Sequence, residues 1–350
     1  MKQGRHVTKL VMQTNVNRLE RLLQSCCVVV LINIIQVSSM EGAEPVSSKK
    51  PADVSRPVAA AVTRALPFLW QEGERWIEER GCVSCHQVPL MVWSLSAALE
   101  RGFPVSKKRH QNHKEWSVHP ASFVGPEGEE RYQLASAMSG NTDTMSMLLL
   151  GLGGNRHGGE EWKKVFSEAL LDNQKTNGLW DACGQLPAQK RPLEETNRVS
   201  SKRAMLALLR QGYDPRRFNL KSMVSPNTLT VSTEAIAVRL LLLKYGSPTS
   251  VLESTKKLLQ RQNTDGVLGW ISGQASDALA TGITLYALRV VGTGDAVCDA
   301  LGAGDQFLIR TQLEDGSWRV SGTKRKADNA PTETAIYWGT AWAVVGLLER

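Results

Sequence analysis

The feature that most constrains the fold of this chain is a loop signature that recurs three times. Each copy follows an apolar segment and consists of a glutamine, a glycine and a tryptophan: Gln174, Gly178 and Trp180; Gln262, Gly266 and Trp270; Gln312, Gly316 and Trp318. The glutamine amide can bond backbone groups at a helix end, the glycine permits a sharp turn, and the tryptophan offers a face on which the amide stacks. We interpret these residues as a structural repeat. The wide gap between the first two copies predicts a further unit that has lost its signature.

Helical periodicity fills most of the chain around these loops. From residue 66 onward there is no sustained apolar–polar alternation of the kind that a half-buried strand needs. The predicted helices span 66–80, 88–101, 141–152, 160–173, 195–210, 230–245, 249–262, 277–291, 300–311 and 332–349. Many of them run into a glycine, a residue that closes helices readily. The sequence therefore predicts an all-α protein built from helical repeats.

The third loop carries the clearest family resemblance. Residues 312–318 have the sequence QLEDGSW, which resembles the QxxDGSW repeat of the squalene-cyclase and prenyltransferase superfamily. The resemblance covers about residues 66–350. It implies an α/α toroid (a terpenoid-cyclase-like barrel) of about six helix pairs, in which outer and inner helices alternate and the repeat loops tie the outer layer together. The resemblance implies this fold more specifically than any activity, because fold and chemistry separate easily.

Several predicted helices open with a hydroxyl or amide residue beside an acid. The pairs are Thr142 and Asp143, Thr233 and Glu234, Ser276 and Asp277, and Thr332 and Glu333, with Glu195, Thr196 and Asn197 as a variant. Oxygen atoms at a helix start accept hydrogen bonds from unpaired backbone N–H groups, and acids favour the positive end of the helix dipole. We interpret the pairs as helix caps. The alternative is that the acids line the mouth of a cavity.

The resemblance raises the question of proton-initiated cyclisation. Triterpene cyclases of the superfamily protonate their substrate with the middle acid of a DxDD motif, because clustered acids keep one carboxyl group protonated. The nearest match here is Asn141, Thr142, Asp143 and Thr144, which retains only the final aspartate. Thr142 occupies the position of the proton donor. A squalene-cyclase activity is therefore not expected.

A second family motif is only half present. Protein prenyltransferases hold zinc with an Asp-x-Cys pair and a later histidine, and Asp181 and Cys183 match the first half. The last histidine of the chain is His157, so no downstream third ligand exists. A zinc site needs at least three protein ligands. We interpret Cys183 as a small buried thiol.

The strongest chemical motif is CxxCH. Residues 81–86 have the sequence GCVSCH, which is typical of covalent attachment of haem c. The thiols of Cys82 and Cys85 would anchor the haem vinyl groups, and His86 would be the proximal iron ligand. Candidates for a sixth ligand are His110, His113, His119, His157, Met91, Met138, Met145 and Met147. Core packing is the simpler interpretation for Met91, Met145 and Met147.

Two alternatives to haem remain open at these cysteines. One is a Cys82–Cys85 disulfide, which an oxidising compartment permits. The other is zinc, held by Cys82 and Cys85 together with His110 and His113.

The N-terminus is typical of an export signal. The apolar run 26–37 (CCVVVLINIIQV) follows basic residues and precedes small ones, and it is short for a membrane span. We therefore predict a signal peptide over 1–43, a linker over 44–65 and the toroid over 66–350. Export places the protein in the periplasm, or tethers it to the membrane if the segment is uncleaved. The N-terminal segment is the only expected membrane contact.

Charge and the loop segments complete the prediction. The net charge is +8 over 350 residues, which is mildly basic and does not indicate a nucleic-acid partner. The polar segment 105–131 shows no helical periodicity and is either a lid over the CxxCH region or a solvated insertion. The expected function is electron transfer or haem redox chemistry with a redox partner protein. The alternatives are a haem-free, terpenoid-cyclase-like enzyme with an isoprenoid or other apolar ligand in its cavity, and a non-catalytic binding toroid.

Overall fold

The computed structural model describes residues 54–83, 87–124, 138, 140–153, 160–225, 230–246, 248–292 and 294–349. All of them belong to one compact unit, and the predicted signal peptide 1–43 lies outside them. Twelve α-helices and no strand occur in this part of the chain, which confirms the all-α prediction. None of these helices combines the length and the apolar character that crossing a membrane requires.

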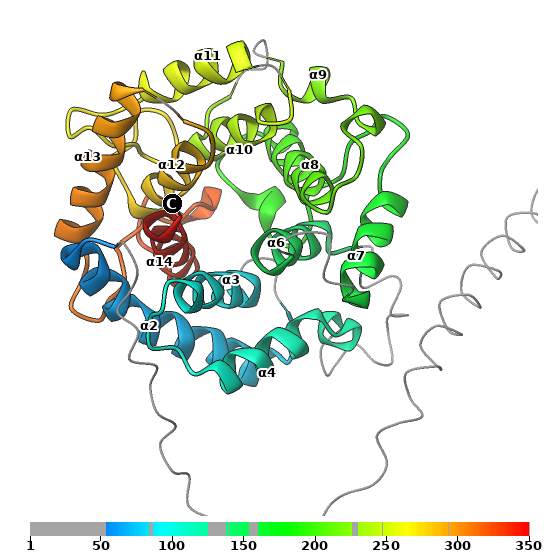
Figure 1. Ribbon diagram of the computed structural model, residues 1–350, viewed down its shortest axis with the longest axis horizontal. Helices are drawn as coiled ribbons and strands as arrows, with labels where there is room; N and C mark the ends of the chain where they lie inside the picture. Colours follow the sequence, from blue (N-terminus) through cyan, green and yellow to red (C-terminus); the bar gives the residue numbers. More distant parts are fainter. Residues whose placement is uncertain are drawn as a thin grey trace, which may run out of the picture. The chain divides into compact units, whose positions relative to one another are not determined.

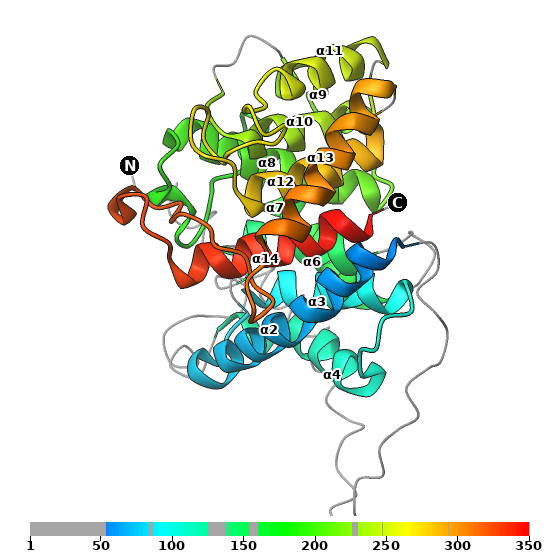
Figure 2. The same ribbon diagram turned by 90° about the vertical axis from the view of Figure 1, so that its left-hand side faces the viewer.

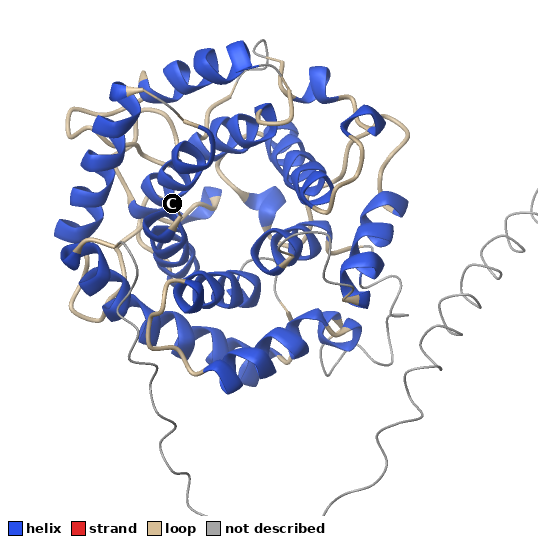
Figure 3. Cartoon of the chain, in the orientation of Figure 1, coloured by secondary structure: helices blue, strands red, loops and turns tan. Residues whose placement is uncertain are grey.

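The helices form two concentric rings (Figures 1 and 3). The outer helices are α2 (Arg56–Arg80), α4 (Lys107–Val118), α7 (Glu161–Asp172), α9 (Leu220–Met223), α11 (Pro248–Leu259) and α13 (Asp295–Thr311). The inner helices are α3 (Gln87–Glu100), α6 (Thr142–Leu152), α8 (Leu193–Arg210), α10 (Thr233–Leu243), α12 (Ala278–Val291) and α14 (Glu333–Leu348). Each inner helix packs against the next, and α14 packs against α3 to close the ring. The predicted α/α toroid of six helix pairs is therefore confirmed.

Burial explains which helices lie inside. Every residue of α10 is buried, as are residues 278–288 of α12, so these helices are covered on all sides. Outer helices such as α7 bury one stripe only. The closest inner contact is between α12 and α14, where a Cβ atom on Gly282 would lie 2.4 Å from the Trp342 carbonyl carbon. Glycine permits this approach.

The repeat loops connect outer to inner helices by the same set of contacts. The Gln174 amide donates to the Gly178 carbonyl over 3.0 Å, and the Gln312 amide donates to the Gly316 carbonyl over 2.9 Å. Gly178, Gly266 and Gly316 have φ angles of +79°, +79° and +84°, which only glycine adopts readily. The indole N–H groups of the first and third copies return to the outer helix, Trp180 to the Leu170 carbonyl and Trp318 to the Leu308 carbonyl, each over 2.7 Å.

The last repeat loop also closes the outer ring. The Gln312 amide donates to the Ala61 carbonyl over 2.8 Å, and the Gln312 oxygen accepts from the Arg64 guanidinium over 3.0 Å. Both partners lie on α2, which belongs to the first helix pair. The second copy differs, because its longer loop leaves the Trp270 indole nitrogen without a partner in the described residues.

The structure corrects the predicted elements at two places and contains the repeat unit that was predicted to lack the signature. Helix α2 begins at Arg56, so the predicted linker 44–65 ends at residue 55; the alanine-rich run after Pro57 is a strong helix former. The described part of the segment 105–131 forms the outer helix α4 and the 3₁₀ turn Pro120–Phe123 and is not an irregular insertion, whereas residues 125–131 lie outside the described residues. Helix α4 is almost wholly polar, which hid its periodicity. The missing repeat copy corresponds to α9, an outer helix of four residues.

Candidate functional site

The residues at the starts of the inner helices that were predicted as caps have two different structural roles. Asp277 caps α12, because its carboxylate accepts from the Ala280 N–H over 2.8 Å and from the Trp270 N–H over 2.7 Å. Thr332 caps α14 by accepting from the Ala335 N–H over 3.3 Å. The capping prediction is confirmed for these two helices. In α10 the cap is Ser232 and not Thr233, and in α6 and α8 no side chain caps the helix.

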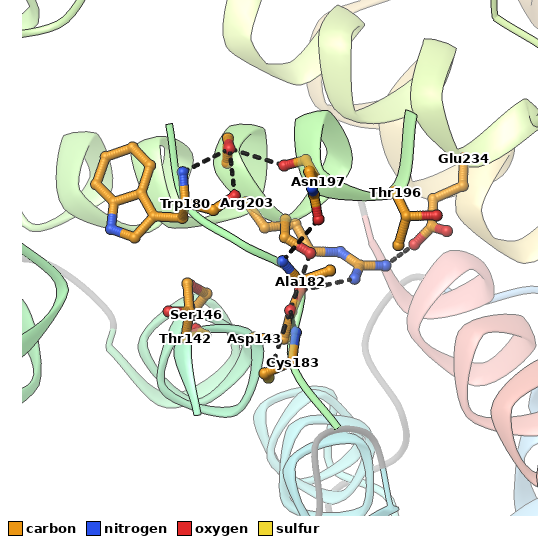
Figure 4. Close-up of polar contacts among 12 residues, drawn as sticks. Thr142, Asp143, Ser146, Trp180, Ala182, Cys183, Thr196, Asn197, Arg203 and Glu234 are labelled. Carbon is orange, nitrogen blue, oxygen red and sulfur yellow. Dashed lines mark hydrogen bonds and ion pairs between the residues drawn. The ribbon is translucent and has the colours of Figure 1, made fainter. Parts of the chain in front are cut away.

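Asp143, Glu195 and Glu234 form a buried charge cluster with two arginines, of which Figure 4 shows Asp143, Glu234 and Arg203. Glu234 of α10 is fully buried and pairs with Arg203 of α8 and, over 2.6 Å, with Arg191. The second nitrogen of the Arg203 guanidinium lies 3.5 Å from Asp143 of α6. The cluster therefore joins three neighbouring inner helices, with acids from the first turns of α6 and α10 and an arginine from the middle of α8. The capping prediction is wrong for Asp143.

Glu195 belongs to the same cluster. Its carboxylate accepts from the backbone N–H groups of Val231 over 2.8 Å and Ser232 over 2.9 Å, and from the Ser232 hydroxyl over 2.5 Å. The Arg191 guanidinium also donates to Ser232, over 3.3 Å. Glu195 thus holds the segment before α10 by hydrogen bonds and does not cap α8. The capping prediction is wrong for this acid.

The carboxylate of Asp143 is saturated by donors. One oxygen accepts from the Ser200 hydroxyl over 2.9 Å and from the backbone N–H and the thiol of Cys183 over 3.4 and 3.5 Å. The Asp181 carboxylate is exposed and pairs with Lys175 over 2.7 Å. The Asp181 and Cys183 side chains therefore have separate partners, and within the described ranges no group of three His, Cys, Asp or Glu residues could hold a metal ion.

Beneath the charge cluster the barrel contains an aromatic chamber. The ring centroids of Trp93, Tyr286 and Trp342 lie 5.2 to 5.8 Å apart, and the Trp93 ring meets both of the others edge-on. The chamber is also lined by Arg203 and by aliphatic side chains, and it has a volume of about 20 Å³. This volume suits about one water molecule. The Trp342 indole N–H, which is buried there, has no partner in the described part of the chain.

Two loops from opposite sides of the ring meet at the N-terminal ends of the inner helices. The loop before α8 and the loop before α14 join where the Lys190 N–H donates to the Thr323 carbonyl over 2.8 Å. The Arg325 guanidinium donates to the carbonyls of Gln189 and Pro187, each over 3.1 Å. Figure 1 shows both loops through the opening of the ring, and Figure 2 shows the loop before α14 projecting beyond its end. We call this pair, residues 184–192 and 319–332, the crossed loops.

Arg191 links the crossed loops to the charge cluster. It is the last residue but one before α8, and its side chain is completely buried. Its guanidinium lies over the Trp270 ring, 5.5 Å from the centroid, in addition to its contact with Glu234. Burial lowers the pKa of Arg191 to about 10, while Glu195 and Asp143 act in the opposite direction. Arg191 remains charged at neutral pH.

The CxxCH motif lies only partly in the described residues. Cys85 and His86 fall outside them, as does His157. Cys82 is half-buried after α2, and burial raises the pKa of its thiol. Its carbonyl accepts from the Trp76 indole over 3.1 Å, and the Val83 N–H donates to the Ser122 carbonyl over 2.7 Å. The segment after α4 therefore contacts the motif.

The structure gives partners to the proposed histidine ligands. His110 is buried, and its Nε2 lies 3.0 Å from the Ser96 hydroxyl. His113 contacts the Arg109 carbonyl over 2.7 Å through Nδ1 and Glu74 over 3.1 Å through Nε2. These contacts turn both rings toward α2 and α3.

The other candidates for a sixth ligand are dispersed. The Nδ1 atom of His119 caps the turn Pro120–Phe123, and its ring is exposed. Met147 lines the aromatic chamber, Met91 packs against Gly73 of α2, and Met138 and Met145 are buried. Exposure makes His119 the most accessible of these side chains.

The charge cluster was not predicted as a unit. Arg191 and Arg203, which hold it together, were not among the predicted site residues. Arg203 could have been found, because it is a charged residue of the helix α8 and is followed by the apolar run 204–209. Arg191 lies in a loop, and no periodic pattern marks it.

Comparisons with known proteins support the fold alone. No protein-family model matches the sequence, and no curated protein matches it. Among solved structures, a protein from Actinoplanes superposes with a TM-score of 0.53 at 15% identity, covering 83% of this chain and 98% of that one. The type II terpene cyclase MstE from Scytonema gives 0.52 at 14% identity, covering 84% and 98%. A possible member of the GH105 family from Salmonella enterica gives 0.51 at 12% identity, covering 90% and 98%.

Proposed function

We propose that the barrel binds an apolar, isoprenoid-type ligand, and that the toroid acts as a binding module and not as a proton-initiated cyclase. The observation that carries this proposal is the chamber of Trp93, Tyr286 and Trp342 beneath a charged end. Aromatic faces suit the double bonds of an isoprenoid, and ligand sites are mostly apolar with a few polar groups that fix orientation. The Trp342 N–H, which lacks a partner among the described residues, would donate to an oxygen atom of the ligand.

The charge cluster argues against acid catalysis. A proton donor must keep its carboxyl group neutral, which requires either burial away from cations or the presence of a second carboxylate close by. Glu234 has two guanidinium partners, and Asp143 has one together with a hydroxyl donor. Both surroundings stabilise the charged carboxylate, so neither acid is suited to protonate an alkene.

Ligand entry requires the barrel to open, because the chamber volume of about 20 Å³ is far below that of an isoprenoid. We propose that the barrel opens at the crossed loops. Their mutual contacts are mainly hydrogen bonds made by exposed side chains such as Arg325, each worth about 1 kcal/mol. The stronger attachment is the buried pair of Arg191 with Glu234. Loop opening would therefore be resisted mainly by Arg191.

Equilibrium dialysis with radiolabelled geranylgeraniol tests this proposal. We expect saturable binding, weakened about fivefold in Trp342→Phe, which keeps the aromatic ring and removes the N–H donor. Trp162→Phe on outer helix α7 is the matched control and should bind as the wild type does. Absence of saturable binding, or equal loss in both variants, would refute the chamber as the site. Recovery of cyclised geranylgeraniol would refute the binding-module assignment.

The CxxCH motif supports a second function at a separate place. We propose that Cys82 and Cys85 anchor a covalent haem c, with His86 as proximal ligand, in an exported protein that exchanges electrons with a redox partner. The donor set fits, because two thiols and an imidazole are the groups that haem c attachment uses. Bound haem would supply one-electron redox chemistry. The chain's own contribution is to hold Cys82 after α2, through Trp76, and Val83 through Ser122.

An absorption spectrum of protein exported in a host with cytochrome c maturation tests the haem proposal. A Soret band that sharpens on reduction and survives acid–acetone extraction is expected, and Cys82→Ala with Cys85→Ala should abolish it. Cys298→Ala, at an exposed cysteine of α13, is the control. Colourless wild-type protein would refute the proposal without affecting the result of the dialysis experiment.

A further inference from the structure

A cleft lies at the C-terminal ends of inner helices α10 and α12, beside outer helix α11, which packs on α10 (Figure 1). It has a volume of about 370 Å³, which falls in the range of about 300–1,000 Å³ that small-molecule sites occupy. The aromatic chamber has only about 20 Å³ and shares no lining residue with it. The cleft is therefore a second cavity, separate from the one inside the barrel.

The walls of the cleft are mainly aliphatic. Leu243 comes from α10, Val251 and Leu252 from α11, and Val290 and Val291 from α12, so three helices contribute apolar side chains. Leu252 is 67% exposed, which shows that solvent reaches this wall. A ligand with an apolar body would remove these side chains from water, and that removal is the main driving force for binding at such a surface.

A buried hydroxyl group also lines the cleft. Thr255 of α11 is only 4% exposed, and its Oγ1 atom has no hydrogen-bond partner in the described residues. A threonine in a helix can donate its hydroxyl to the carbonyl four residues earlier, as Thr311 and Thr340 do over 2.7 Å. Thr255 does not make the corresponding bond to Val251. A ligand oxygen in the cleft would supply the partner that this hydroxyl lacks.

The charges around the cleft favour a neutral ligand. The C-terminal ends of α10 and α12 bring helix carbonyl groups and the negative ends of two helix dipoles to the cleft, and these disfavour an anion. Lys244, which is exposed, is the only charged residue among the described residues of the lining, and it disfavours a cation. Carbonyl groups at a helix end accept hydrogen bonds, so a neutral ligand with an O–H group matches both features.

We propose that this cleft binds a neutral, medium-chain aliphatic alcohol. The aliphatic chain covers Val251, Leu252 and Val290, and the Thr255 hydroxyl donates to the alcohol oxygen. The alcohol O–H donates in turn to a carbonyl group at the end of α10 or α12. Because the cleft and the aromatic chamber have no lining residue in common, this site does not depend on the isoprenoid ligand proposed for the barrel.

Titration with 1-octanol, followed by saturation-transfer difference NMR, tests the site. We expect saturable binding to the wild-type protein, weakened about fivefold in Thr255→Val, which keeps the shape of the side chain and removes the hydroxyl. Thr249→Val, at an exposed threonine of the same helix, is the matched control and should bind as the wild type does. Val290→Trp, which fills the cleft, should abolish binding.

Two variants separate this site from the barrel. Trp342→Phe should leave 1-octanol binding unchanged, and Val290→Trp should leave the binding of geranylgeraniol unchanged. Loss of 1-octanol binding in Trp342→Phe would place the alcohol in the aromatic chamber and overturn the proposal for the cleft. Failure of the geranylgeraniol experiment alone would leave the cleft proposal standing.

Other outcomes would also overturn the proposal. Absence of saturable 1-octanol binding to the wild type would do so, and tighter binding of octanoate would show that the cleft selects an anion. If Thr255→Val binds 1-octanol as the wild type does and has a higher Tm without ligand, the Thr255 hydroxyl is only an unsatisfied buried group. Should Val290→Trp fail to fold, the comparison of Thr255→Val with Thr249→Val decides the same question.

Discussion

The starts of α12 and α14 differ from those of α6, α8 and α10, although the sequence marks all five alike. On one side of the ring a residue of the marked pair itself caps the helix, as Asp277 and Thr332 do. On the other side Asp143, Glu195 and Glu234 are drawn into a buried cluster with two arginines. The same acid at a helix start therefore has a role that depends on whether a cation reaches it.

The two arginines of the cluster come from different parts of the chain, and tertiary structure brings each of them to the acids. Arg203 comes from the middle of α8, and Arg191 comes from the crossed loops that span the end of the ring. Among the described residues neither has an equivalent beside Asp277, whose carboxylate accepts from backbone N–H groups. The difference thus lies in the loops and in one residue of α8, not in the helix starts themselves.

The largest expected effect comes from breaking the cluster at its most connected acid. Glu234→Gln removes the charge shared by Arg191 and Arg203 and leaves two buried guanidinium groups undercompensated. Loss of one partner of a buried pair costs about 3–5 kcal/mol. Denaturant unfolding should show this loss in the free energy of unfolding.

The control is the first-turn acid of α14. The Glu333 side chain is 88% exposed, and Glu333→Gln should change stability by less than about 0.5 kcal/mol. Equal losses in the two variants would show that both acids act only on the helix dipole, and the distinction between the two sides of the ring would then fail.

Much of the fold follows from the sequence alone. The ten predicted helices correspond to α-helices of the toroid, because their apolar spacing and terminal glycines are local signals. Helix α4 was missed because the sequence 107–118 is almost entirely polar. It packs on α3 and is held there by contacts such as that of His110 with Ser96. A local sequence pattern does not predict such contacts.

The site was less predictable, for a physical reason. Whether Asp143 caps α6 or pairs with a cation depends on Arg203, which is 60 residues away in the chain. The contact of Arg191 with Glu234 likewise needs the crossed loops to be in place. Long-range charge pairing leaves no periodic trace, whereas the repeat loops are local and their glutamine, glycine and tryptophan could be identified directly.

An effect of intermediate size is expected in the pH dependence of the free energy of unfolding, through Asp277 at the start of α12. Burial raises the pKa of Asp277 to about 6, against the lowering effect of its backbone N–H donors. An acid whose pKa is higher in the folded state favours folding when protonated, so its contribution to stability is lost as pH rises from about 4 to about 6. Asp277→Asn keeps a capping side chain and should gain about 2–3 kcal/mol relative to the wild type between pH 4 and pH 7.

Urea unfolding of both proteins across this pH range measures the difference. Glu333→Gln serves again as the reference, because its exposed carboxylate should leave the pH profile unchanged. A constant offset between Asp277→Asn and the wild type at every pH would show that Asp277 is charged in the folded state throughout, held by the N–H groups of Ala280 and Trp270.

The smallest expected effect is the loss of stability when a repeat-loop tryptophan loses its hydrogen bond, and it should be the same on both sides of the ring. Trp180 and Trp318 donate to the outer helix with the same geometry, whereas the Trp270 indole nitrogen has no such partner. Substitution of each by phenylalanine removes similar volume, so the hydrogen bond should make Trp180→Phe and Trp318→Phe about 1 kcal/mol more costly than Trp270→Phe. Urea unfolding measures the loss in the free energy of unfolding for each variant. Equal losses in Trp180→Phe and Trp318→Phe would show that the two sides of the ring differ only in the charged residues of the inner helices. A difference between them as large as their difference from Trp270→Phe would mean that the outer layer also distinguishes the two sides.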